Sequence, residues 1–280
     1  MLAIPRGGGG TLAGEEMGPA DGPPIVLLHG LTATRRYVVH GSRVLPREGH
    51  RTIAYDARGH GESDPAPPGS GYDYQDLTGD LADVLAASVG EGPAILAGHS
   101  MGTHTIASYA LAHQEQLAAV ILIGPTVTGE APSAESLAYW DSLATGLETG
   151  GVEGFVRAYD HDLDPGWRET LLRITRERLG KHRHPEAVAQ ALRDVPRSLP
   201  FDDLAALETL TVPALVVASH DEADPGHPFA VADAWAARIP QARLVSEEPG
   251  QSPLAWQGGR LSREIAAFCA TSPVRERLRA

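Results

Sequence analysis

The 280-residue sequence predicts an α/β protein with a mostly parallel central sheet, helices on both faces and an inserted all-helical segment. Short apolar runs alternate with helical patterns, and each connection is long enough for a crossover between parallel strands. Only helical signals occur over residues 130–208, after which the alternation resumes. We therefore expect one core domain formed by residues 1–129 and 209–280. Residues 130–208 are expected to form a helical lid over the carboxyl edge of the sheet.

The first half of the chain contains four continuous apolar runs, as expected for strands buried on both faces. They are residues 25–28, 52–55, 94–97 and 117–123. The sequence between them predicts helices over 37–45, 77–88 and 103–113. Gly90 stands where a glycine ends the second of these helices. The Gly- and Pro-rich residues 1–24 predict an edge hairpin that turns at Gly7–Gly10.

The lid segment contains three helix starts. Ser133 precedes an apolar pattern, Asp164-Pro165 offers an N-cap followed by proline, and Pro185 opens a third helix. The alternation then resumes with strands at 213–218 and 243–246 and helices at 229–239 and 261–268. The charged tail from Thr271 is expected to be frayed surface.

Composition and charge narrow the class of protein. Hydrophobic residues make up 42% and charged residues 21% of the chain, which is typical of a globular protein. The formal charge of −13 argues against nucleic acid and anionic membranes as partners, because phosphate binding needs a basic face. The single cysteine, Cys269, excludes an intramolecular disulfide and fits both a reducing compartment and a small core position.

The sequence lacks the signals of export. Residues 1–10 do not show the charged-then-apolar pattern of a signal peptide, and no apolar run is long enough to span a membrane. We therefore expect a cytoplasmic protein whose partner is a small-molecule substrate. A homo-oligomer is compatible with these observations.

The segment Gly98-His99-Ser100-Met101-Gly102 lies between a predicted strand and a predicted helix. In this context a G-x-S-x-G pentapeptide predicts a nucleophile elbow, a sharp turn that lifts the serine hydroxyl clear of the sheet. Ser100 must take a strained backbone conformation, and a side chain at either glycine would collide with a neighbouring element. The N-terminus of the following helix favours developing negative charge beside the serine.

Three further motifs stand around this elbow in the sequence. His29-Gly30 follows the first long strand, Asp56-Ala-Arg-Gly-His-Gly-Glu-Ser63 follows the second, and Asp224-Pro-Gly-His-Pro228 follows a late strand. In this order the chain resembles the α/β-hydrolase superfamily, which implies the α/β-hydrolase fold and catalysis without a cofactor or metal. The serine at the apex is similar to the esterase, lipase and C–C hydrolase branches. Related dehalogenases and epoxide hydrolases carry an aspartate there.

The resemblance assigns roles to particular residues. Ser100 is the expected nucleophile, and a serine hydroxyl needs both a base and donors for the oxyanion. The backbone N–H groups of Leu31 and Met101 are expected to form the oxyanion hole. Asp224 matches the position of the acid that orients the base, with Asp221 and Glu222 as alternatives.

The base is where the chain departs from the family. The family's histidine lies in a loop after the last strand, and Gln251 occupies that place here. No histidine follows His227. A glutamine side chain is a neutral amide, so it can form hydrogen bonds with Ser100 and Asp224 but cannot take a proton from the serine.

Three hypotheses remain open about this site. In the first, another histidine serves as the base, either His227 beside Asp224 or His161 in the lid. In the second, the replacement by Gln251 stops turnover and keeps binding. In the third, the fold works as a non-hydrolytic enzyme or a ligand-binding protein.

The expected function is hydrolysis of a small or medium carboxylic ester or related acyl compound through Ser100. A hydrolysis-impaired homologue, a ligand-binding protein or a lyase-like enzyme is the alternative.

The residues expected to bind the substrate are His29, Gly30, Trp140 and Trp167. For His29 we favour fixing of its own loop, and for the lid aromatics, which include Tyr139 and Phe155, packing onto the core is an equal alternative. His99 is expected to pack away from the apex.

The remaining polar motifs favour structural roles. Arg58 is expected to pair with a nearby acid, with His60 or Arg58 lining the pocket as the alternative. His182 and His184 are expected at the surface. The acidic segment around His161 has no second histidine at ligand spacing, which favours a solvated loop over a metal site.

Overall fold

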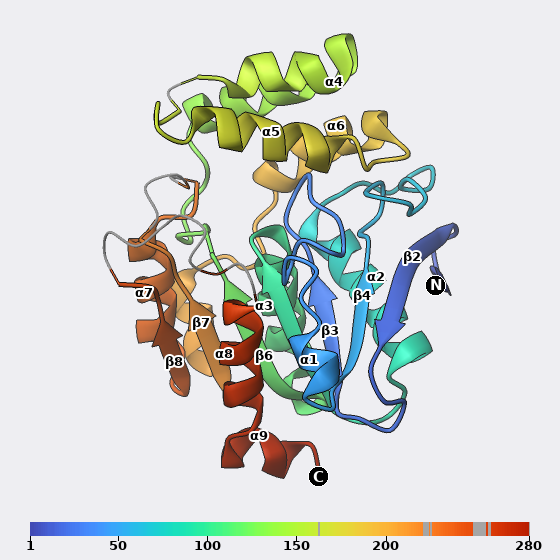
Figure 1. Ribbon diagram of the computed structural model, residues 1–280, viewed down its shortest axis with the longest axis vertical. Helices are drawn as coiled ribbons and strands as arrows, with labels where there is room; N and C mark the ends of the chain where they lie inside the picture. The colour runs from blue at the N-terminus through green and yellow to red at the C-terminus, as the bar shows by residue number, and fades with distance from the viewer. Residues whose placement is uncertain (162, 221–223, 225, 249–255, 257–258, 280) are drawn as a thin grey trace.

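The computed structural model describes residues 1–161, 163–220, 224, 226–248, 256 and 259–279. Within these residues, eight strands form one sheet in the order β1-β2-β4-β3-β5-β6-β7-β8 (Figure 1). The strands are β1 (Leu2–Pro5), β2 (Thr11–Met17), β3 (Pro24–Leu28), β4 (Arg51–Tyr55), β5 (Ala94–His99), β6 (Leu117–Ile123), β7 (Ala214–Val217) and β8 (Ala242–Val245). The first two form the expected edge hairpin, β2 pairs antiparallel with β4, and every later pairing is parallel.

Successive strand residues enter two separate cores because side chains alternate between the faces of a sheet. Leu96 and the strand residues whose side chains share its face of the sheet pack under α2 (Tyr74–Ser88), α3 (Met101–His113) and α7 (Phe229–Arg238). Ile95 and the strand residues on the opposite face of the sheet pack under α1 (Val44–Arg47), α8 (Arg260–Cys269) and α9 (Ser272–Arg277). The result is the predicted α/β-hydrolase architecture, with helices on both faces of a mostly parallel sheet.

Three helices form a separate layer beyond one edge of the sheet (Figure 1). They are α4 (Ala134–Tyr159), which is interrupted by a non-helical Gly151, α5 (Arg168–Leu179) and α6 (Pro185–Asp194). These helices bury their own apolar cluster, and Leu31 from the loop after β3 packs against it. The carboxyl end of β3 therefore faces this layer.

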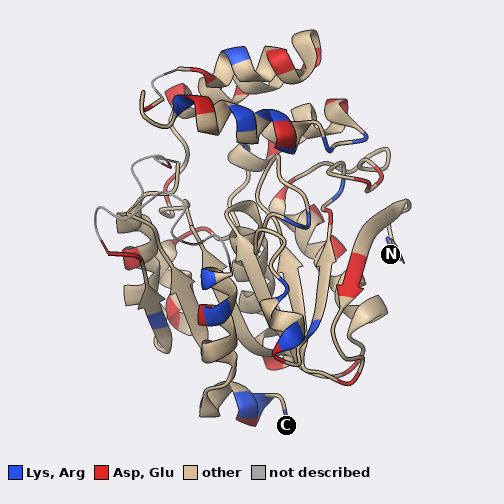
Figure 2. Ribbon diagram, in the orientation of Figure 1, with Lys and Arg blue, Asp and Glu red and all other residues tan. Residues whose placement is uncertain are grey.

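Short 3-10 helices complete the described structure at Gln114–Gln116, Val195–Arg197 and Leu204–Thr209. Figure 2 shows basic and acidic residues interspersed along the helices of the α4–α6 layer. No helix among the described residues has both the length and the apolar character needed to cross a membrane.

The prediction of a helix over residues 37–45 is wrong. This segment forms turns, and only α1 at Val44–Arg47 is helical. His40 and Gly41 have φ angles of 49° and 69°, outside the right-handed helical region. A continuous helix therefore cannot run through this segment, although its apolar residues have helical spacing. The third lid signal, at Pro185, does open a helix, whereas α5 begins at Arg168 after a turn rather than directly at Asp164-Pro165.

The C-terminal tail is also different from the prediction of frayed surface. It forms α9, whose Val274 is fully buried in the second core. The guanidinium of Arg277 donates to the carbonyl oxygens of Leu117 at 2.8 Å and Gln114 at 2.7 Å. These contacts dock the tail against the start of β6. Cys269 lies buried on α8, and burial raises its thiol pKa to about 12.

Candidate active site

Ser100 stands at the turn between β5 and α3. Its φ and ψ are 51° and −115°, a conformation that a non-glycine residue adopts only under constraint. A Cβ atom at Gly98 would meet the backbone of Gly102, and one at Gly102 would meet the carbonyl group of Leu28. The Ser100 N–H donates to the carbonyl oxygen of Ile123 at 2.9 Å. The strand, helix and neighbouring strand thus leave room for glycine alone and hold the serine at the apex.

The loop after β3 lies directly against this elbow. A Cβ atom at Gly30 would come within 2.9 Å of Nδ1 of His99 and 3.3 Å of Cβ of Ser100. The N–H of Leu31 has no recorded acceptor among the described residues. Met101 is the first residue of α3, so its N–H has no partner within the helix. Two backbone donors are therefore left near the serine.

His29 is engaged by its own loop. It is 2% exposed, with Nδ1 2.8 Å from the carbonyl oxygen of Gly30 and Nε2 accepting from the N–H of Ala57 at 2.9 Å. Burial and the neighbouring His60 lower its pKa to about 3. Both ring nitrogens hold the backbone, so neither is available to take a proton from Ser100.

Asp224 and His227 form a pair in the loop between β7 and α7. Nδ1 of His227 lies 2.8 Å from Oδ2 and 2.9 Å from Oδ1 of Asp224. Partial burial would raise the pKa of Asp224, but the hydrogen bond with His227 and the neighbouring positive charges keep this pKa below its ordinary value. An ionised carboxylate at Nδ1 fixes the tautomer in which Nε2 carries a lone pair. Nε2 has no recorded hydrogen bond to a described residue.

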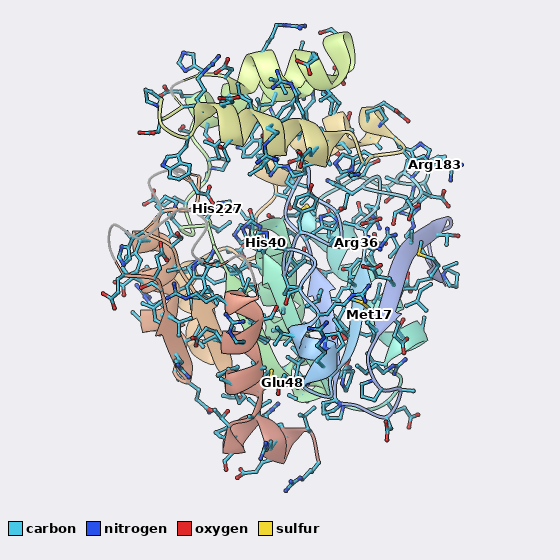
Figure 3. The ribbon with its side chains drawn as sticks, in the orientation of Figure 1. Met17, Arg36, His40, Glu48, Arg183 and His227 are labelled. Atoms are coloured by element: carbon cyan, nitrogen blue, oxygen red, sulfur yellow. The ribbon has the colours of Figure 1, made fainter. Side chains whose placement is uncertain are left out.

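His227 lies beside the elbow (Figure 3). Its ring centroid is 4.8 Å from that of His99, the residue before Ser100. A Cβ atom on Gly124 would lie 3.2 Å from Cδ2 of His227, and Gly124 follows the residue whose carbonyl oxygen accepts from the Ser100 N–H. No hydrogen bond between the Ser100 hydroxyl and His227 is recorded, and in enzymes without substrate such bonds are often long.

Gln251, Asp221 and Glu222 lie outside the described residues. His161 is exposed in the loop after α4. His99 is half-buried and its ring packs against that of His227. Its loss of solvent and the neighbouring His227 lower the pKa of His99 to about 3.

The aromatic residues of the α4–α6 layer take different positions. Phe155 is buried in the apolar cluster of these helices and Trp140 packs against that cluster. Tyr139 is exposed, and Trp167 is half-buried where α5 begins. Their roles toward a substrate stay predictions.

His182 is not a free surface residue, as the sequence suggested. Its Nε2–H donates to the carbonyl oxygen of Thr32 at 2.8 Å, and its Nδ1 accepts from the N–H of Gly61 at 2.8 Å. Burial and the neighbouring His60 lower its pKa to about 3. His182 therefore ties the segment between α5 and α6 to two core loops. His184 is half-buried, 3.4 Å from Glu186.

Arg58 pairs with an acid, as expected. Its Nε and Nη2 each donate to Asp80 at 2.7 Å, inside the core behind the elbow. His60 is buried, 1% exposed, with Nδ1 3.0 Å from the carbonyl oxygen of Arg58. Among the described residues, no group of three His, Cys, Asp or Glu side chains is arranged to hold a metal ion.

Comparison with known proteins places these features in context. A family model described as alpha/beta hydrolase fold matches residues 23–182. The RutD protein of Variovorax paradoxus, named as a carbamate hydrolase, is 30% identical over 211 residues, covering 75% of this chain and 77% of RutD. The 2-(acetamidomethylene)succinate hydrolase of Mesorhizobium japonicum is 29% identical over 215 residues, covering 74% and 73%. A solved esterase from Thermogutta terrifontis, with malate bound, has a TM-score of 0.78 at 24% identity, covering 99% and 98%.

Proposed function

Because this chain belongs to the α/β-hydrolase fold family, we propose that it is a serine hydrolase of small or medium acyl compounds, with Ser100 as nucleophile and His227 as base. The observation that carries this proposal is the pairing of Asp224 with His227 beside the strained Ser100 elbow. An aspartate that holds Nδ1 leaves Nε2 as the proton acceptor that a serine nucleophile requires. This arrangement does not depend on Gln251.

The proposed reaction follows from these groups. Ser100 Oγ attacks the carbonyl carbon while Nε2 of His227 takes the hydroxyl proton, and the N–H groups of Leu31 and Met101 bind the oxyanion. The tetrahedral intermediate expels the alcohol, which takes the proton from His227, and an acyl-enzyme remains. Water then gives a proton to His227 and attacks the acyl carbon. The free acid leaves and the proton returns to Ser100.

The related proteins support an acyl substrate. Carbamates and acetamido compounds, the chemical classes in two relatives' names, both carry a carbonyl carbon open to attack by a nucleophile. We propose that the α4–α6 layer acts as the lid over this site, because Leu31 of the oxyanion loop packs directly against it. Within this class of acyl compounds, the proposed substrate is a small or medium carboxylic ester.

Hydrolysis of p-nitrophenyl acetate and butyrate tests the proposal. The wild-type protein is expected to release p-nitrophenol, and Ser100→Ala is expected to reduce the rate to the uncatalysed background while its melting temperature stays close to wild type. A rate in Ser100→Ala equal to wild type would exclude Ser100 as the nucleophile.

Gln251→His distinguishes this proposal from the hydrolysis-impaired alternative. If His227 already supplies the base, a second histidine is expected to leave kcat/KM unchanged within about threefold, because one general base is enough to take the Ser100 proton. If no base exists, the new histidine would raise kcat/KM by about 10²-fold or more. Such a gain would contradict the role of His227.

A further inference from the structure

His104 is a buried histidine that connects the helix of the nucleophile to the loop after β6. It lies on α3 one helical turn after Ser100, and its backbone N–H donates to the carbonyl oxygen of Ser100 at 3.1 Å. The residue is 2% exposed. Its Nε2 accepts from the backbone N–H of Thr126 at 3.0 Å, and its Nδ1 lies 2.8 Å from the hydroxyl oxygen of Tyr74 on α2. Both ring nitrogens are therefore engaged. His104 was not among the residues that we singled out from the sequence, although it follows the elbow serine by one turn.

These contacts require one neutral tautomer of His104. Because a backbone N–H can only donate, Nε2 must carry a lone pair toward Thr126, and the ring proton lies on Nδ1 and is donated to Tyr74. Burial and the neighbouring His227 lower the pKa of His104 to about 3, so the ring stays neutral near pH 7. The ring thus serves as a fixed hydrogen-bond acceptor for the loop after β6 and not as a base.

The loop that His104 holds lies against the ring of His227. A Cβ atom on Gly124 would lie 3.2 Å from Cδ2 and 3.4 Å from Cγ of His227, so the backbone at Gly124 stands close to the imidazole. The ring of His99 contacts the same imidazole, with 4.8 Å between the two centroids. Two residues after Gly124, Thr126 donates its N–H to His104. The loop after β6 therefore limits where the imidazole of His227 can lie.

The next residue of this loop is tied to the helix that follows His227. Trp235 of α7 is fully buried, and its Nε1–H donates to the carbonyl oxygen of Val127 at 2.7 Å. The ring of Trp235 also contacts that of His104, with 5.8 Å between the two centroids. His104 and Trp235 thus hold the loop at Thr126 and Val127, two adjacent residues. This arrangement joins α3, which follows Ser100, to α7, which follows the segment of His227.

We propose that His104 is a positioning residue: through the N–H of Thr126 it fixes the loop after β6 against His227 and so keeps the imidazole in place for Ser100. This inference rests on the proposed function, because it concerns the proposed base. Ser100 and His104 lie one turn apart at the start of one helix, so a single rigid element sets both the nucleophile and the support of the base. Displacement of a reacting group by about 1 Å can cost about 10²-fold in rate.

Two substitutions of His104 separate the hydrogen bond from the space that the ring fills. Glutamine can place its amide oxygen near the position of Nε2 and accept from Thr126, whereas leucine fills the space and accepts nothing. His104→Leu is expected to lower kcat for p-nitrophenyl butyrate by about 10- to 100-fold and to leave KM within about threefold of wild type. His104→Gln is expected to keep kcat within about threefold of wild type.

Tyr109→Phe is the control on the same helix. Tyr109 is buried on α3, and its hydroxyl donates at 2.6 Å to Oε1 of Gln116, which precedes β6 at the end opposite the loop. Its substitution also removes one side-chain hydrogen bond and is expected to leave kcat unchanged.

A merely structural role of His104 would lower the melting temperature of His104→Leu and leave kcat of the folded protein unchanged. That result, or equal losses of kcat in His104→Leu and His104→Gln, would overturn the proposal. If His104→Leu does not fold, His104→Asn takes its place with the same expected loss, because the shorter amide reaches toward Tyr74 and not toward Thr126.

Two NMR measurements without substrate separate failure of this inference from failure of the proposed function. Amide hydrogen exchange at Thr126 is expected to be slow in wild type and His104→Gln, and at least about tenfold faster in His104→Leu. The proton on Nδ1 of His227, a downfield resonance that disappears in His227→Gln, is expected to shift or broaden in His104→Leu alone. If the ester is not hydrolysed but both signals depend on His104 in this way, the support of His227 stands and the hydrolase fails. If the ester is hydrolysed and neither kcat nor the His227 resonance depends on His104, the hydrolase stands and the positioning role is excluded.

Discussion

Nδ1 of His227 lies 2.8 Å from Oδ2 of Asp224, three residues earlier in the same loop. The acid and the imidazole are therefore held by one short segment, whereas the family pattern takes the histidine from the loop after the last strand. The β7–α7 connection places this pair beside His99, next to the elbow. His227 can therefore accept a proton, which Gln251 at the family's histidine position in the sequence cannot do.

We expect His227→Gln to lower kcat for ester hydrolysis by at least about 10³-fold, because glutamine cannot accept the Ser100 proton. KM is expected to change much less. Steady-state kinetics on p-nitrophenyl butyrate measures both quantities.

His161→Gln is the matched control for this prediction, since His161 is exposed in the loop after α4. Its kcat is expected to equal that of wild type. A large loss in His161→Gln with none in His227→Gln would assign the base to the lid.

Gly30→Ala is expected to lower kcat by about 10- to 100-fold through displacement of one oxyanion donor. The added methyl group would lie 2.9 Å from Nδ1 of His99, so the loop carrying Leu31 must move. Gly79→Ala serves as the control, because Gly79 lies on the exposed face of α2 and a Cβ atom there meets nothing within 4 Å. That change is expected to stabilise the protein by about 0.5–1 kcal/mol and to leave kcat unchanged. A fully active Gly30→Ala protein would argue against the oxyanion role of this loop.

Arg58→Met is expected to lower the free energy of unfolding by about 3–5 kcal/mol, because it leaves the Asp80 carboxylate buried without its cation. Asp80 is 2% exposed and accepts two hydrogen bonds from Arg58. Arg238→Met removes an exposed pair with Glu208 and is expected to cost no more than about 1 kcal/mol. Urea unfolding at pH 7 compares the two variants, and equal losses would contradict the structural role of Arg58.

His182 makes stability depend on pH. Its folded-state pKa is about 3 and its unfolded value is about 6.5, so the unfolded chain binds more protons between these values. Stability is therefore expected to be full above about pH 6.5 and to fall as the pH drops toward 3. His182→Gln removes this contribution, so the slope of unfolding free energy against pH is expected to become shallower between pH 6 and 4.5. Identical slopes in urea titrations of both proteins would refute this linkage.

The sequence was sufficient to predict the elbow because its constraints are local. Gly98 and Gly102 are required by contacts with elements adjacent in sequence or in the sheet, and Ser100 lies at the turn that joins them. The strands were predictable for a similar reason, since burial on both faces demands continuous apolar runs. The spacing of Asp224 and His227 is also visible in the sequence. The position of His227 beside His99, however, depends on how the loops after β5, β6 and β7 meet.

Long-range packing explains the features that the sequence did not reveal. α9 is held by Arg277, which donates to the carbonyl oxygen of Leu117, 160 positions earlier in the chain. His182 donates to the carbonyl oxygen of Thr32, 150 positions away in the chain, so this contact could not be inferred from the polar segment around His182.

The central claim is that His227 activates Ser100, and labelling by a fluorophosphonate probe tests it most directly. Such probes react with a serine whose hydroxyl has an effective base, and mass spectrometry measures the rate and position of labelling. We predict that Ser100 is labelled in wild type at least about 100-fold faster than in folded His227→Gln. Absence of labelling in folded wild type, or equal labelling rates in the two proteins, would contradict the claim.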